Sequence, residues 1–223
     1  LIDRAIALNP NVAEAHNNLG MALQNLRRYA EAVASYDRAI ALKPGFVDAL
    51  NNRGVALAEL GQHALAVAAY DAALAIDPGY ADAWSNRGSA LRQLGRNEDA
   101  ARNFAQAHLL RPGFKYAIGH QMYAQAATCD WTNFDAHVGA LNTTVRQGGQ
   151  GALAAEPFVF LAFAQTAQDQ LLNARTFAAD KYPPSPRPLW NGARYKHPKI
   201  RVAYLSADFH EHATAYLMAE LFE

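Results

Sequence analysis

The first 112 residues carry a pattern of apolar and polar positions that repeats every 34 residues. Prolines mark the ends of successive copies, at Pro10, Pro44, Pro78 and Pro112. Within each copy the apolar positions favour two amphipathic helices, and the proline ends the second helix because its ring clashes with a preceding carbonyl. The pattern therefore predicts a row of stacked helical pairs.

Each copy also places small and bulky residues at matching positions. A glycine falls midway in the first helix, where it costs about 1 kcal/mol against alanine, so its repetition indicates close helix–helix approach. An alanine recurs on the second helix, and an aromatic residue is expected to pack between repeats. A turn joins the two helices, with glycine in two copies. These positions are Gly20, Gly54 and Gly88; Ala32, Ala66 and Ala100; Tyr36, Tyr70 and Phe104; and, in the turns, Arg27, Gly61 and Gly95.

The 34-residue period is typical of tetratricopeptide repeats, which stack into a superhelix with a binding face. We predict such a superhelix over residues 1–112, with three complete copies and the tail of a fourth. The third copy matches the repeat signature at Trp84, Gly88, Leu91, Ala100, Phe104, Ala107 and Pro112.

One register of the first helix lies nearly opposite the core positions, at about 100° per residue, and carries Asn18, Asn52 and Asn86. An asparagine amide can donate and accept at once, as a peptide backbone requires. Helices about 10 Å apart would offer one asparagine per roughly three residues of an extended peptide. These asparagines are candidate polypeptide-binding residues. Alternatively, they are copies of one ancestral solvent-facing residue, and His120 breaks the row.

Residues 113–182 lose the repeat but keep a helical pattern, including 133–147, and we interpret them as atypical capping helices. Cys129 and Trp131 fall at a predicted helix boundary, and we interpret both as packing residues. The lone cysteine and the scattered histidines lack the spacing of a metal site, so no metal is predicted.

Four prolines between Pro183 and Pro188 predict a stiff connector over residues 183–198. Residues 199–223 favour a strand, a loop and a helix, as at the beginning of an α/β domain. His210 and His212 lie in that loop, where such folds usually bind ligands. From the residues alone, they could be a metal pair, solvated loop residues, or a general base near a helix N-terminus.

Charge and composition narrow the class of partner. Lys+Arg and Asp+Glu both number 20, so no net field favours nucleic acid or an anionic membrane. A single cysteine excludes an internal disulfide and favours a reducing, cytoplasmic compartment. No apolar run approaches the roughly 20 residues of a membrane span. Both ends interrupt helical patterns, so we expect the chain to be part of a longer protein.

Several segments together resemble the bacterial form of the O-linked N-acetylglucosamine transferases. They are the asparagine row, "CDW" at 129–131, "PFVFLA" at 157–162 and "RVAYLSADFHEHATAYL" at 201–217. The resemblance implies a GT-B-type catalytic domain with two Rossmann-like lobes, which begins at 199 and is truncated at Glu223. His212 matches the family's histidine, as a base or a substrate-positioning group, whereas His210 does not.

The same resemblance implies transfer of N-acetylglucosamine from UDP-GlcNAc to Ser or Thr of polypeptides, with no further cofactor. Asn18, Asn52 and Asn86 match the row that grips the acceptor. The implied mechanism is an inverting displacement, aided by a proton acceptor and by stabilisation of the leaving diphosphate. We expect the 223-residue chain alone to be inactive, because the second lobe would follow Glu223. The alternatives are a non-catalytic scaffold and a related protein O-fucosyltransferase that uses GDP-fucose.

Overall fold

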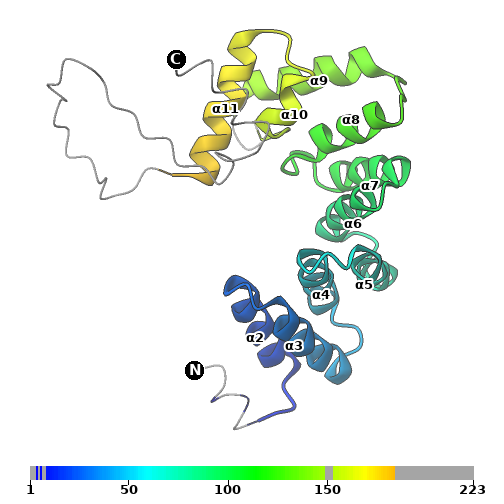
Figure 1. The fold of residues 1–223 in the computed structure, drawn as a ribbon, viewed down its shortest axis with the longest axis vertical. Coiled ribbons are helices and arrows are strands. Elements are labelled where there is room, and N and C mark those ends of the chain that lie inside the picture. Colours follow the sequence, from blue (N-terminus) through cyan, green and yellow to red (C-terminus); the bar gives the residue numbers. More distant parts are fainter. Residues whose placement is uncertain (1–3, 5, 7–8, 149–152, 184–223) are drawn as a thin grey trace, which may run out of the picture. The chain divides into compact units, whose positions relative to one another are not determined.

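The computed structural model describes residues 4, 6, 9–148 and 153–183, which contain ten α-helices and no strand (Figure 1). The chain divides into two units, Leu1–Pro183 and Pro184–Glu223, and only the first contains described residues. His210, His212 and the predicted strand and helix over 199–223 lie outside the described residues, as does the predicted connector beyond Pro183.

The predicted helical pairs are confirmed. Each proline follows its second helix by two residues, so all three second helices end as predicted. We refer to these six helices as the array. The pairs are α2 (Ala13–Asn25) with α3 (Tyr29–Leu42), α4 (Val47–Glu59) with α5 (His63–Ile76), and α6 (Ala81–Gln93) with α7 (Asn97–Leu110).

The turns within the pairs are also confirmed. Gly61 and Gly95 have φ values of 74° and 76°, and Arg27 takes the same left-handed conformation at 59°. The residue after each turn donates its backbone N–H to a carbonyl five residues earlier, as Gln62 does to Leu57 at 2.9 Å. This is the bond of a Schellman motif, which favours glycine at the left-handed position.

The repeated glycines make room for the repeated aromatic residues. A Cβ on Gly54 would lie 2.5 Å from the Tyr70 ring, and one on Gly20 equally close to the Tyr36 ring. Each aromatic ring therefore packs against the first helix of its own repeat, whereas the pattern predicted a contact between repeats. The rings also belong to clusters that include the next repeat, since Tyr36 shares its cluster with Ala56.

The first helices form a row, because α2 contacts α4 and α4 contacts α6. Beyond the array lie four further helices, α8 (Ala117–Ala127), α9 (Phe134–Gln147), α10 (Pro157–Leu161) and α11 (Ala167–Lys181), which we call the cap. Helix α8 packs on α7, and Ala124 joins the cluster of Phe104. The other side of α8 belongs to a separate core with Met122, Leu141 and Phe160.

Helix α8 ends at Ala127, so the predicted boundary near Cys129 is confirmed, but the packing interpretation is wrong. Cys129 is exposed, and Trp131 is 57% exposed, with its ring in edge-to-face contact with that of Phe134 at a centroid distance of 5.2 Å. Both residues lie in the loop between α8 and α9. Among the described helices, none is both long and apolar enough to cross a membrane.

Candidate functional site

The structure places Asn18, Asn52 and Asn86 on α2, α4 and α6, in the same register of the first-helix row. Asn18 is exposed, whereas Asn52 and Asn86 are half-buried. We call these three residues the asparagine stripe. The prediction that they share one face is consistent with the structure, and their role in binding stays a prediction.

Two residues of the stripe also hold neighbouring helices together, which the sequence reasoning missed. The Asn52 amide donates to the side-chain oxygen of Asn17 at 3.2 Å, and Asn86 donates to Asn51 at 3.0 Å. Asn17 and Asn51 are only 6% exposed. The sequence did contain a signal for these bonds, because two copies have a pair of adjacent asparagines, at 17–18 and 51–52. Each stripe residue keeps its carbonyl oxygen and at least one N–H for a ligand.

Acidic residues one turn earlier on the row have different partners in the three copies. Glu14 pairs with Lys43 at 2.9 Å and Asp82 with Arg111 at 2.7 Å. The middle copy has an aspartate where the others have these cations, and Asp48 instead accepts a hydrogen bond from the Tyr80 hydroxyl at 2.9 Å. Burial, followed by that bond, raises the pKa of Tyr80.

The stripe leads into a hollow of about 800 Å³, which we call the end pocket. One wall is the exposed side of α6, and the other is built from the segment before α8, from α8 itself and from the far end of α11. Figure 1 shows α6 and α7 followed by α8, where the array meets the cap. Its lining includes Asp82, Ser85, Asn86, Ser89, Arg111, Phe114, Lys115, Tyr116, His120, Leu153 and Asp180.

A segment of the cap closes the row at α8. The carbonyls of Leu153 and Ala154 accept hydrogen bonds from the backbone N–H groups of Tyr116, at 2.6 Å, and Gly119, at 2.9 Å. The next carbonyl, of Ala155, accepts from the Asn173 amide at 3.0 Å. A Cβ on Gly119 would lie 2.4 Å from that of Ala155, so only glycine admits this approach. The chain's own backbone thus covers α8 where the row would continue.

His120 occupies the position on α8 that corresponds to the asparagine stripe, as the sequence indicates. Unlike the stripe residues, its side chain is largely buried. Its side chain is 15% exposed, its ring lies 5.1 Å from that of Phe104, and its Nε2 lies 3.9 Å from the Glu156 carboxylate. Burial lowers the pKa of His120, although Glu156 opposes the shift. The net effect favours the neutral imidazole.

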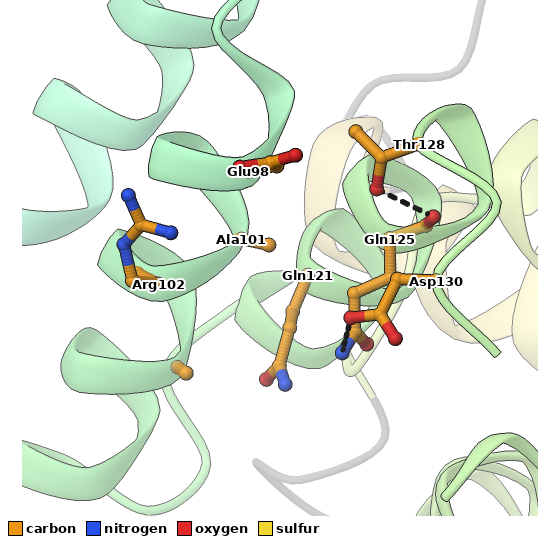
Figure 2. A pocket seen from close by; sticks show the side chains of 8 residues that line it. Glu98, Ala101, Arg102, Gln121, Gln125, Thr128 and Asp130 are labelled. Atoms are coloured by element: carbon orange, nitrogen blue, oxygen red, sulfur yellow. Dashed lines mark hydrogen bonds between the residues drawn. The ribbon is translucent and has the colours of Figure 1, made fainter. Parts of the chain in front are cut away.

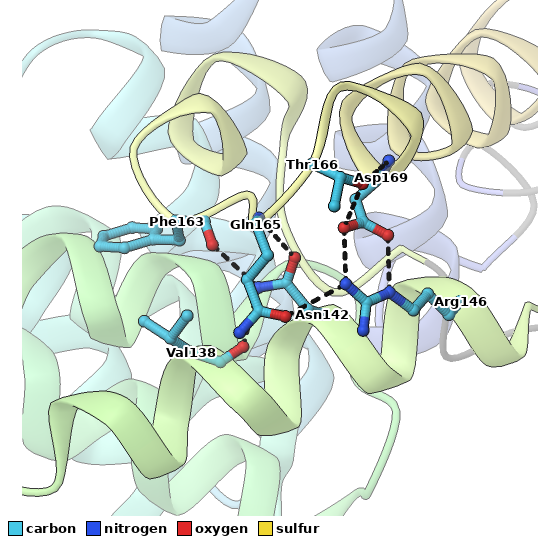
Figure 3. A network of polar contacts seen from close by, with 7 residues as sticks. All are labelled: Val138, Asn142, Arg146, Phe163, Gln165, Thr166 and Asp169. Atoms are coloured by element: carbon cyan, nitrogen blue, oxygen red, sulfur yellow. Dashed lines mark hydrogen bonds and ion pairs between the residues drawn. The ribbon is translucent and has the colours of Figure 1, made fainter.

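In the cap, the side chain of Asn142 binds the backbone of the turn between α10 and α11 (Figure 3). The buried Asn142 amide donates to the carbonyl of Phe163 at 2.8 Å, and its oxygen accepts from the N–H of Gln165 at 3.1 Å. Beside it, Arg146 forms a bidentate ion pair with Asp169, with both distances 2.7 Å. These bonds pack the segment before α11 onto α9.

A second hollow, of about 400 Å³, lies between α7 and α8 (Figure 2). Its polar groups are engaged locally, since Gln125 donates to Asp130 at 3.4 Å and Thr128 to the carbonyl of Gln125 at 2.9 Å. Within the described ranges, no three His, Cys, Asp or Glu side chains converge in a way that could hold a metal ion.

Two tetratricopeptide-repeat models match the sequence, one over residues 18–81 and the other over residues 1–34 and 69–102. The chain therefore contains tetratricopeptide repeats, in agreement with its helical pairs. No functionally curated protein matches the sequence.

Several solved tetratricopeptide structures are similar to this one. A MamA from Desulfovibrio magneticus RS-1 aligns with a TM-score of 0.60 at 23% identity, over 66% of this chain and 82% of its own. The first repeat domain of Spaghetti (RPAP3), bound to an HSP90 peptide, aligns with a TM-score of 0.52 at 24% sequence identity, over 52% of this chain and 93% of its own. The Arabidopsis OM64 repeat domain aligns with a TM-score of 0.51 at 28% sequence identity, over 52% of this chain and 95% of its own. These likenesses establish the fold.

Proposed function

We propose that the first-helix row binds an extended polypeptide and that the asparagine stripe holds it by its backbone. The observation that carries the proposal is the shared register of the three asparagines, each with unused amide capacity on adjacent helices. Asn142 supports the chemistry, because it pairs with a backbone carbonyl and a backbone N–H together. The RPAP3 repeat domain, which binds an HSP90 peptide, is a precedent for a peptide on this fold.

The binding test uses peptides of about 15 residues, made of Ala-Xaa-Pro triplets with blocked ends and a fluorescent label. Proline favours the polyproline II helix, with three residues per turn and about 3.1 Å per residue, so each triplet spans about the distance between neighbouring helices. Fluorescence anisotropy with the alanine-guest peptide measures binding by backbone contacts. Replacement of Asn18, Asn52 and Asn86 by alanine should weaken binding at least tenfold, since each net hydrogen bond contributes about 1 kcal/mol.

The matched control is Asn97→Ala, an asparagine at the beginning of α7 and outside the row. It should leave the affinity unchanged. Because Asn52→Ala and Asn86→Ala also remove bonds between helices, circular dichroism must show that the triple variant is folded. Unchanged affinity in a folded triple variant would reject the role of the stripe.

On the sequence resemblance at 201–217, we also propose that the complete protein transfers N-acetylglucosamine from UDP-GlcNAc to Ser or Thr of the bound polypeptide. His212 would serve as the base or would position the substrates. A cytoplasmic location is part of this proposal, since sugar-nucleotide chemistry and the single cysteine both suit it. The rivals are a non-catalytic scaffold and an O-fucosyltransferase.

Titration of the complete protein with UDP-GlcNAc and GDP-fucose separates these functions. Saturable binding of UDP-GlcNAc with turnover is expected for the proposed transferase, and loss of turnover in His212→Ala would support the role of that residue. Binding of neither nucleotide would favour the scaffold. The 223-residue chain itself should show no turnover.

A further inference from the structure

The end pocket lies where the asparagine stripe stops. Asn86, the last stripe residue, lines it, and Leu153, from the segment that covers α8, lines it too. A polypeptide that follows the row from α2 to α6 therefore meets this pocket where the array joins the cap. The chemistry of the pocket then decides which side chains can enter.

The four charged side chains Asp82, Arg111, Lys115 and Asp180 in the pocket form two ion pairs. Arg111 lies 2.7 Å from the Asp82 carboxylate, and Lys115 lies 2.6 Å from Asp180. The Arg111 guanidinium also lies over the Phe114 ring, 4.9 Å from its centroid. Each charge in these partly exposed pairs already has its counter-charge, so the pocket offers a charged ligand group no unpaired partner and no electrostatic advantage.

The groups with unused hydrogen-bonding capacity are neutral. Tyr116 is 9% exposed, and its buried hydroxyl has no hydrogen-bond partner among the described residues. Ser85 is 8% exposed and also makes no hydrogen bond in the described part of the chain. Burial, followed by the charge of Asp180, raises the pKa of Tyr116, so its hydroxyl remains a donor. The Asp180 carboxylate also attracts this proton, but the hydroxyl makes no hydrogen bond of normal geometry to it, so its donor capacity is available to a ligand.

Tyr116 is held rigidly in this position. Its backbone is left-handed, with φ at 64°, and its N–H is fixed by the carbonyl of Leu153. Its ring contacts the rings of His120 and Phe177, with centroids 6.2 and 6.1 Å away. The hydroxyl is therefore preorganised, so a ligand that accepts its hydrogen bond does not have to order it.

We propose that the end pocket selects an uncharged polar side chain of the bound polypeptide, such as serine, threonine, asparagine or glutamine, through the hydroxyls of Tyr116 and Ser85. This inference rests on the proposed binding of polypeptides along the row. It adds sequence preference at one place to a surface that otherwise recognises only backbone.

The test compares Ala-Xaa-Pro peptides that differ only at Xaa, with serine, alanine, glutamate or lysine as the guest. The 223-residue chain should bind the serine peptide about tenfold more tightly than the alanine peptide, and both charged peptides more weakly than serine. Tyr116→Phe keeps the ring and removes the hydroxyl, so it should reduce the preference for serine over alanine to about twofold or less. Adding Ser85→Ala should abolish it.

Tyr182→Phe is the matched control, because Tyr182 is 77% exposed and does not line the pocket. It should preserve the preference for serine. Equal binding of serine and alanine peptides, tight binding of a charged peptide, or an unchanged preference in folded Tyr116→Phe would overturn the inference.

The failure of this inference can be distinguished from that of the proposed function. If the alanine peptide binds and replacement of the stripe weakens it, but serine brings no advantage, only the pocket assignment fails. If replacement of the stripe leaves the affinity for the alanine peptide unchanged, the proposed function fails. If the chain binds none of the peptides, both are wrong.

Discussion

The array and the cap use the same amino acid in opposite ways. In the cap, Asn142 and Asn173 are almost fully buried and bind the chain's own backbone. In the array, the asparagine stripe lies on an accessible face, and its known bonds are to the side chains of Asn17 and Asn51. An asparagine amide suits a backbone in both places, and burial decides whether that backbone belongs to the chain or can belong to a partner.

The largest difference is expected when one asparagine is removed from each region. Asn142→Ala leaves a carbonyl and an N–H of the Phe163–Gln165 segment without their partner, at a cost of about 2–4 kcal/mol. Asn18→Ala, on the exposed stripe, should change the free energy of unfolding by less than about 0.5 kcal/mol. Urea denaturation of both variants measures this, and similar losses would contradict the comparison.

A second prediction compares two glycines of the array. Gly54→Ala would force a methyl group into the Tyr70 ring and should destabilise the protein by about 1–3 kcal/mol. Gly45→Ala is the control, because a Cβ there meets nothing within 4 Å. The difference between their free energies of unfolding isolates the glycine–aromatic contact. If both variants match the parent, that contact does not limit packing.

A third prediction concerns the acid stability of the cap. Hydrogen bonds from Arg146, and then from Thr166, lower the pKa of Asp169 to about 2. Since an aspartate in an unfolded chain titrates near pH 3.9, the carboxylate stabilises the fold above that pH, and the stabilisation is lost as the pH falls towards 2.

Asp169→Asn should therefore remove part of the loss of stability between about pH 4 and pH 2, and it should lower the stability at pH 7. Thermal unfolding across that range measures the effect. Asp135→Asn, on the exposed side of α9, is the control and should keep the acid dependence of the parent. An identical pH profile for Asp169→Asn would show that the ion pair does not contribute.

The smallest effect is expected at the turn of the first repeat. Arg27 has the left-handed backbone that glycine supplies in the next two copies. Arg27→Gly should relieve the steric cost of that conformation, and the greater flexibility of glycine in the unfolded chain should offset part of the gain. We expect a stabilisation of at most about 1 kcal/mol by chemical denaturation. A loss of stability would show that the Arg27 side chain contributes more than its backbone costs.

Sequence reasoning succeeded wherever a feature repeats at short range. The helix ends before the prolines, the turns at Gly61 and Gly95, and the register of the stripe all follow from the 34-residue period. Part of the packing was also predicted, since the glycines do mark close approach. The aromatic residues were predicted to pack between repeats, whereas each ring packs on the glycine of its own repeat, because periodicity gives positions along a helix but not which neighbour fills the gap.

In the cap, sequence reasoning identified helices but not their contacts. Cys129 and Trp131 were interpreted as packing residues because cysteine and tryptophan are usually buried, yet both are exposed in the loop between α8 and α9. The end pocket escaped sequence reasoning altogether. It combines one face of α6 with Tyr116, Leu153 and Asp180, which no period relates.

The sequence by itself determined the repeat, its helical pairs and the common face of the asparagine stripe, because each depends on helical periodicity within about 34 residues. Only the tertiary structure decided where that face ends. The row ends at α8 because the backbone of residues 153–155 lies against Gly119, at a distance that only glycine permits. This end of the row also depends on Asn173, which lies 18 residues beyond the carbonyl it binds. Contacts between segments so far apart follow from packing and leave no periodic trace in the sequence.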